Sequence, residues 1–142
     1  MAFKVLVPLS VFILTYLLAA PVFTCENSDI QKSYPISLLV YNSHVSPMNL
    51  TFNTEIAYRG ILLGAMRKIQ AVDKNFTFTI VEDPNYGPFL VSVNGAAGNP
   101  AEHTYWELLV QPQNGTIIRP DVGVGCYIPN PYDTIILKFT TW

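Results

Sequence analysis

One stretch of this sequence has the spacing of an amphipathic helix, and this limits the folds open to the chain. Charged and polar residues, Arg67, Lys68 and Gln70, lie on the side opposite the apolar ones. The pattern predicts a helix that begins after Gly60 and ends near Asp73. We expect it to pack on a sheet through an apolar face formed by Ile61, Leu62, Ala65, Met66 and Ile69.

Most of the remaining sequence consists of short β-like runs separated by turn residues. Residues 34–41 and 50–58 flank a turn-rich segment and are expected to form an antiparallel hairpin. Residues 82–85 are expected to form another turn. One helix among many short strands predicts an α+β fold, with the helix packed on mainly antiparallel strands in a β-grasp-like arrangement. The other predicted strands are 77–81, 89–93, 104–110, 116–118, 124–128 and 134–140.

Residues 1–24 have the layout of a secretory signal peptide, in which a lone Lys4 precedes an apolar run from Val5 to Ala20. The run is shorter than a bilayer span requires and contains Pro8, so a membrane-spanning helix fits it less well. We expect cleavage after Thr24. The mature protein would then be residues 25–142, a single extracellular domain with no membrane insertion.

Several residues indicate modifications typical of secreted proteins. Cys25 and Cys126 are the two cysteines, and an oxidising compartment favours a disulfide between them. This disulfide would close a loop of roughly 100 residues, for an entropic stabilisation of about 4–5 kcal/mol. Two free or intermolecular thiols are the alternative. Asn-x-Thr sequons predict N-linked glycans at Asn49, Asn75 and Asn114.

Composition and motifs exclude several classes of function. The formal net charge is −2 and only 13% of residues are charged, which is unlike a nucleic-acid-binding surface. Neither His44 nor His103 belongs to a metal-ligand or nucleophile motif, and the cysteines lack metal-ligand spacing. The sequence has no glycine-rich phosphate loop. We therefore expect a protein that is not an enzyme and does not bind nucleic acid or a structural metal.

Two aromatic clusters between Asn85 and Leu109 are the main candidates for a binding surface. The Asn94-Gly95 dipeptide between them favours a tight turn, so we expect a hairpin-like unit with large rings at both ends. These rings could form part of the core or the rim of a ligand-binding face. The clusters are Asn85-Tyr86-Gly87-Pro88-Phe89-Leu90 and Thr104-Tyr105-Trp106-Glu107-Leu108-Leu109.

From about Tyr34 to Trp142, the sequence resembles the C-terminal β-domain of the cobalamin carriers, the family of transcobalamin, intrinsic factor and haptocorrin. Several short motifs carry this resemblance by their order and spacing. They are Ile61-Leu62-Leu63, Phe76-Thr77-Phe78, Tyr86-Gly87-Pro88, Ser92-Val93-Asn94-Gly95, Thr104-Tyr105-Trp106, and Gly123-Val124-Gly125 followed by Tyr127-Ile128-Pro129.

The resemblance implies a function and a set of contact residues. In the family, cobalamin is held between a helical barrel and this small domain. By position, the cobalamin-binding candidates here are Asn85, Tyr86, Gly87, Pro88, Phe89 and Leu90, together with Trp106, Glu107, Leu108 and Leu109. The implied function is that of a secreted protein that binds and helps transport cobalamin or a related corrinoid.

The sequence also departs from the family pattern. It has no helical barrel domain, so we expect a free-standing β-domain that binds weakly alone or needs a helical-domain partner or a cell-surface receptor. Tyr86 stands where the family usually has Trp, Glu107 replaces a usual Gln, and the loop from Gln111 to Val122 is longer. The alternative hypothesis is a secreted glycoprotein interaction module that keeps the fold but binds no cobalamin.

Overall fold

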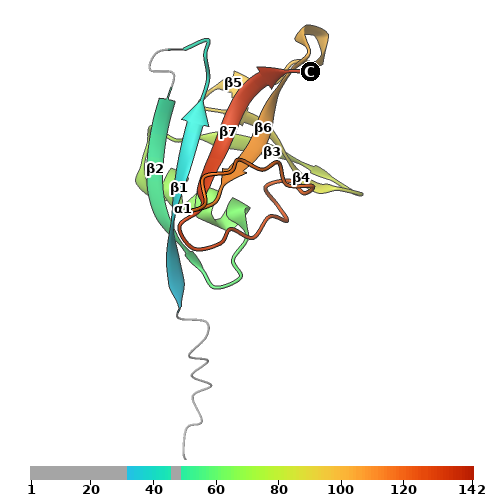
Figure 1. Ribbon diagram of the computed structural model, residues 1–142. Coiled ribbons are helices and arrows are strands. Elements are labelled where there is room, and N and C mark those ends of the chain that lie inside the picture. The colour runs from blue at the N-terminus through green and yellow to red at the C-terminus, as the bar shows by residue number, and fades with distance from the viewer. Residues whose placement is uncertain (1–31, 46–48) are drawn as a thin grey trace, which may run out of the picture.

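The computed structural model describes residues 32–45 and 49–142 (Figure 1). The predicted signal peptide and Cys25 lie outside these residues. The described chain confirms the predicted α+β fold, with one α-helix and mainly antiparallel strands. In order, the elements are β1 (Ser33–Tyr41), β2 (Asn49–Ala57), α1 (Leu62–Val72), β3 (Phe78–Asp83), β4 (Gly87–Val93), β5 (Ala96–Ala97), the 3-10 helix η1 (Pro100–Glu102), β6 (Thr104–Gln111) and β7 (Thr134–Thr141).

The larger sheet has the strand order β2-β1-β7-β6. As predicted, β1 and β2 form an antiparallel hairpin, whereas β1 pairs with β7 in parallel. Pro35 lies before the first β1–β7 pair, which joins Ser37 to Thr134, so the missing Pro35 N–H costs the sheet no hydrogen bond. Alternate residues of β1 are buried, which shows that one face of this sheet packs against the core.

The smaller sheet, β3-β4-β5, is antiparallel throughout, and its β3–β4 hairpin extends beyond the larger sheet (Figure 1). A register shift after Thr79 leaves Val91 as an extra residue on β4. Asn94 and Gly95 have φ angles of 49° and 80° and form the predicted tight turn. This turn joins β4 only to the short β5. The expected hairpin-like unit from Asn85 to Leu109 is therefore wrong, because β6 belongs to the larger sheet.

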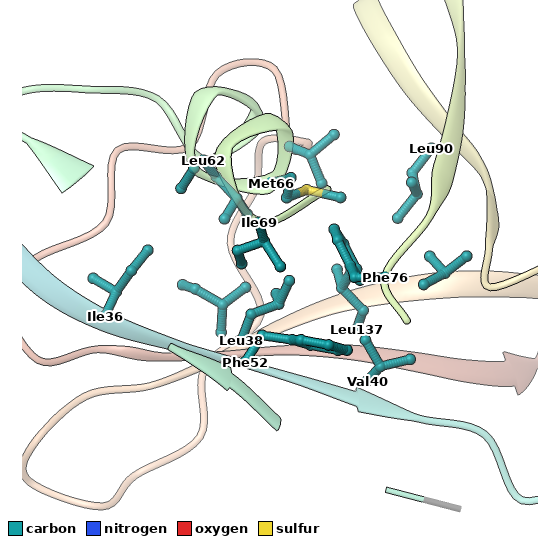
Figure 2. Close-up of a cluster of buried hydrophobic side chains, with 14 of the residues drawn as sticks. Ile36, Leu38, Val40, Phe52, Leu62, Met66, Ile69, Phe76, Leu90 and Leu137 are labelled. Atoms are coloured by element: carbon teal, nitrogen blue, oxygen red, sulfur yellow. The ribbon is translucent and has the colours of Figure 1, made fainter. Parts of the chain in front are cut away.

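Helix α1 covers the inner face of the larger sheet, as its apolar spacing predicts. Figure 2 shows Met66 and Ile69 on the side of the helix that faces Leu38 and Phe52. Full burial of each such side chain is worth about 1.5–3 kcal/mol relative to exposure. Ile61 precedes the helix and is exposed, so the buried helical face consists of Leu62, Leu63, Ala65, Met66 and Ile69.

The predicted strand at 124–128 is wrong, because this segment forms a turn that caps the start of α1. The Leu62 N–H donates to the Tyr127 carbonyl at 2.8 Å, and the Leu63 N–H donates to the Val124 carbonyl at 2.9 Å. The first N–H groups of a helix have no partner inside it, and here the turn supplies their acceptors. Valine and tyrosine favour strands, but these carbonyls bind a helix end instead of a neighbouring strand.

Two smaller predictions also need correction. The predicted strand at 116–118 is reduced to an isolated bridge between Ile118 and Val110. The turn predicted at 82–85 begins later, because β3 continues to Asp83.

Within the part of the chain that the structure describes, no helix is both long enough and apolar enough to cross a membrane.

Candidate functional site

An apolar pocket of about 120 Å³ lies between β4 and the start of β6. It brings together residues from both predicted aromatic clusters, Phe89 and Leu90 from the first and Trp106 from the second. Thr104 and Tyr105 of the second cluster also line it. Neighbouring residues outside both clusters complete the lining: Val91, Gly98, Pro100 and Trp142. The two clusters therefore meet in space although they belong to different sheets.

Trp106 forms part of the pocket wall and also belongs to the core. Only 7% of its surface is exposed, and its indole Nε1–H donates to the Ala96 carbonyl at 2.7 Å. Its ring packs against Phe139 on β7 with centroids 5.1 Å apart. The hydrogen bond and the ring contact fix the indole, so this side of the pocket is rigid.

Two aromatic side chains that line the pocket are largely exposed, Phe89 at 62% and Trp142 at 65%, and Tyr86, three residues before Phe89 and outside the lining, is 86% exposed. The Trp142 ring makes edge contacts with Tyr105 and His103, at centroid distances of 5.7 and 5.2 Å. We refer to Tyr86, Phe89, Tyr105, Trp106 and Trp142 as the aromatic surface. Large exposed rings beside an apolar pocket are typical of a binding site.

The pairing of β6 with β7 fixes the position of Trp142 beside the pocket. Strands β6 and β7 pair antiparallel, with Thr104 opposite Thr141. The residue after Thr141 therefore lies beside the one before Thr104, and the Trp142 N–H donates to the His103 carbonyl at 3.1 Å. Pairing the two predicted strands from their ends would have found this contact.

The turn between β3 and β4 places Tyr86 at the tip of the hairpin. The Asp83 carboxylate accepts hydrogen bonds from the Asn85 N–H at 2.8 Å and the Tyr86 N–H at 3.0 Å. Gly87 has φ of 74°, a value that side chains disfavour. Asn85 is exposed, whereas Pro88 packs against Gly125. The predicted segment thus divides into an exposed tip and a packed base.

The remaining predicted contacts on β6 do not line the pocket. Leu108 packs against the core, while Glu107 and Leu109 lie on the opposite face of the sheet by strand alternation. Glu107 is buried and forms an ion pair with Arg119 from the long loop. The structure therefore brings Phe89, Leu90 and Trp106 together and separates them from these three residues.

A buried carboxylate organises the chain that leads into β7, away from the aromatic surface. Asp133 accepts hydrogen bonds from the Tyr127 hydroxyl at 3.1 Å and the Asn130 N–H at 2.9 Å. Burial and the adjacent Asp133 charge raise the pKa of Tyr127 to about 12. In the described ranges, no group of three or more His, Cys, Asp or Glu residues is arranged to hold a metal ion.

The predicted modification sites are accessible where they are described. Asn49, Asn75 and Asn114 are all exposed, at the start of β2, before β3 and in the loop after β6. Cys126 is also exposed, in the turn that caps α1. The disulfide remains a prediction, because Cys25 is outside the described residues.

No protein-family model matches the sequence, and no curated protein matches it. Among solved structures, the chain is similar to haptocorrin in complex with Cbi, with a TM-score of 0.68 and 22% identity; the match covers 80% of this chain and 26% of that one. It is also similar to a candidate metal-binding protein from Ruminococcus gnavus, with a TM-score of 0.50, 13% identity, and coverage of 77% and 98%.

These similarities concern the fold, because the sequence identities are low. The chain spans 26% of the length of the haptocorrin chain, which is the share expected for one domain of a larger carrier. In fold, the chain therefore resembles the C-terminal β-domain of the cobalamin carriers, as its sequence motifs predicted.

Proposed function

We propose that this protein is a secreted binder of cobalamin or a related corrinoid and that it contacts the ligand through the aromatic surface. The observation that carries the proposal is the convergence of exposed rings on one apolar pocket, in a domain with the fold of a carrier domain. Rings can cover the flat apolar parts of a large ligand, and main-chain groups can bind its peripheral amides.

The arrangement supports weak binding by the chain alone. The pocket has room only for a small part of a corrinoid, and the exposed rings cover a ligand from one side. Separation of two halves of a site can reduce effective affinity by about 10²–10⁴. A helical-domain partner would supply the second half, and a cell-surface receptor is a further proposed partner.

Of the ten residues predicted from the resemblance, three carry the proposal most directly. Tyr86 and Phe89 are exposed, and Leu90 lines the pocket. Trp142 joins them as a contact that the sequence did not predict. Glu107 is paired with Arg119, so we assign it a role in holding the long loop rather than in binding.

A titration of the purified protein with cobalamin tests the proposal. Corrin absorbance and tryptophan fluorescence should both change and saturate. Because aromatic contacts contribute about 0.5–1.5 kcal/mol each, Phe89→Ala or Trp142→Ala should weaken binding by roughly 2- to 12-fold. Tyr58→Ala is the matched control, because Tyr58 is an exposed aromatic residue outside the aromatic surface.

Two outcomes would contradict the proposal. If a folded protein shows no saturable change up to high micromolar cobalamin, with or without a carrier helical domain, the corrinoid function is wrong. The interaction module that binds no cobalamin would then be the better hypothesis. If cobalamin binds but Phe89→Ala and Trp142→Ala bind as well as wild type, the assigned surface is wrong.

A further inference from the structure

The outer edge of β3 is available for pairing with another strand. The Phe78 N–H points away from β4 and donates to Gln70 Oε1 of α1 at 3.4 Å. Because main-chain groups alternate along a strand, those of Ile80 and Glu82 point the same way. Within the described residues, these groups of Ile80 and Glu82 make no hydrogen bond. An exposed edge of this kind favours the addition of a strand.

A groove of about 390 Å³ lies along this edge, between β3 and α1. Phe78 and Ile80 form its apolar floor, and Arg67 of the helix stands at its wall. In the described part of the chain, neither Arg67 nor Glu82 forms a salt bridge. The edge therefore combines unpaired main-chain groups with an apolar strip and unpaired charges of both signs.

We propose that β3 pairs antiparallel with β3 of a second copy of this chain, about a two-fold axis at Ile80. This register places Ile80 opposite Ile80 and Phe78 opposite Glu82 of the second copy. The main-chain groups of Ile80 then bind those of Ile80 of the second copy, and the Glu82 N–H donates to the Phe78 carbonyl. The Phe78 N–H exchanges its long bond to Gln70 Oε1 for the Glu82 carbonyl of the second copy. Because a two-fold axis repeats each contact, every favourable pair other than the central Ile80–Ile80 pair is formed twice.

The charges agree with this register. Residues 78, 80 and 82 share one face of the strand, so Glu82 of the second copy enters the groove beside Phe78. Arg67 stands at the wall of that groove and meets the carboxylate. On the other face, the exposed Val81 lies beside Thr79 of the second copy. Neither acidic residue of β3 opposes a like charge, because Asp83 lies opposite Thr77.

The pairing would join the two smaller sheets into one continuous sheet. The pocket of each copy would remain accessible, because it lies at the opposite edge of β4 from β3, whereas Tyr86 in the β3–β4 turn would lie near the end of the interface. The dimer is therefore independent of the proposed corrinoid function, and each can fail without the other. Because single-strand contacts are small, we expect a dissociation constant on the order of 10–100 µM.

The Asn75 sequon lies next to this interface. Asn75 lies three residues before β3, and in the proposed register this end of the strand lies towards the β3–β4 turn of the second copy. A glycan on the exposed Asn75 would crowd this turn and weaken the dimer. An Asn75→Gln variant removes the sequon but retains the main-chain N–H that donates to Asp73.

Sedimentation velocity of the full secreted protein across micromolar concentrations tests the proposal, in the wild type and in Asn75→Gln. We expect a reversible dimer in Asn75→Gln at least. In that background, Arg67→Glu or Glu82→Arg should weaken the dimer by about 10-fold or more, because each creates two like-charge pairs. Lys68→Glu is the matched control, because Lys68 lies on the same helix outside the groove.

A mixture of the two charge variants gives the sharpest result. Glu82 of the Arg67→Glu chain meets Arg67 of the Glu82→Arg chain, and the introduced charges meet each other. A heterodimer should therefore form at concentrations at which each variant alone, with its weakened dimer, stays mostly monomeric. The proposal is overturned if the wild type and Asn75→Gln both stay monomeric, or if a dimer forms that neither charge change weakens.

Discussion

At the scale of single residues, Trp106 shows how a residue that lines a pocket and a core residue can be the same side chain. Its hydrogen bond to Ala96 and its contact with Phe139 hold the indole while one side lines the pocket. A Trp106→Ala variant would lose core packing worth about 3–5 kcal/mol, in addition to any ligand contact. The exposed Phe89 and Trp142 therefore test binding more cleanly than Trp106.

Gly125 gives a stability prediction of its own. A Cβ atom at this position would lie 2.7 Å from Cδ of Pro88, which is too close for the turn to keep its place. We expect Gly125→Ala to lower the free energy of unfolding by about 1–3 kcal/mol, measured by urea denaturation.

Gly64 provides the matched control for Gly125. It lies in α1, and a Cβ there meets nothing within 4 Å. Because alanine favours helices, Gly64→Ala should stabilise the protein by up to about 1 kcal/mol. Equal effects of the two substitutions would show that the close contact with Pro88 does not govern stability.

Tyr127 predicts a dependence of stability on alkaline pH. Its pKa is raised from 10.0 to about 12, so the folded state holds the phenol proton more tightly than the unfolded state does. The resulting stabilisation is fully present below pH 10 and is lost as the pH rises towards 12. Denaturant unfolding from pH 8 upward should show this loss in the wild type.

The Tyr127→Phe variant isolates that effect. It lacks the titrating hydroxyl and should be less stable than wild type at neutral pH, because Asp133 loses one donor. The difference between the two proteins should shrink above pH 10. A constant difference across this range would contradict the assignment of the alkaline loss to Tyr127.

At the scale of elements, the helix, most strands and the β1–β2 hairpin were predictable, whereas the pairings between strands distant in the sequence were not. The spacing of apolar residues in α1 and the alternation in β1 are local properties of the sequence. The division into two sheets depends on distant pairings, such as β1 with β7, and on the extra residue Val91 in β4. No local pattern specifies these.

The incorrect strand at 124–128 has the same origin. The β-forming side chains there suggested a strand, but the carbonyls of the turn bind the N–H groups of a helix far away in the sequence.

The candidate site was predictable only in part, because its residues also come from segments that are distant in the sequence. Aromatic residues marked part of the pocket lining, but only the pairing of β6 with β7 shows that Trp142 joins it.

The β3–β4 turn gives a prediction at the scale of elements. Asp83→Ala removes the acceptor for the Asn85 and Tyr86 amides, so hydrogen exchange at both should accelerate. Because the main chain at Tyr86 would be held in place by fewer hydrogen bonds, we expect cobalamin affinity to fall by about 2- to 10-fold. Native-state hydrogen exchange and the cobalamin titration measure the two effects.

Asp73→Ala is the control for that prediction. Asp73 accepts from the Asn75 N–H in a similar turn away from the pocket. Its removal should accelerate exchange at Asn75 without a change in cobalamin affinity. If both variants lower the affinity equally, general loosening of the protein rather than the position of Tyr86 is the cause.

At the scale of the whole molecule, the proposed corrinoid-binding role has the aromatic surface contact the ligand from one side only. The addition of a separate helical domain from a cobalamin carrier should raise the apparent affinity by about 10-fold or more, because the second half then contacts the ligand's other side. Titration calorimetry with and without that domain measures the gain. If the helical domain leaves the affinity unchanged, the chain binds its ligand without a second half of the site.

The parallel pairing of β1 with β7 has a consequence for how the protein folds. β7 lies between β1 and β6 in the larger sheet, yet the ribosome makes it about one hundred residues after β1. Contacts between such distant segments form slowly, and the β1–β2 hairpin alone is marginally stable. The edge of β1 that pairs with β7 therefore stays open until β7 is synthesised, and in this period the nascent chain is most exposed to pairing with a strand of another molecule.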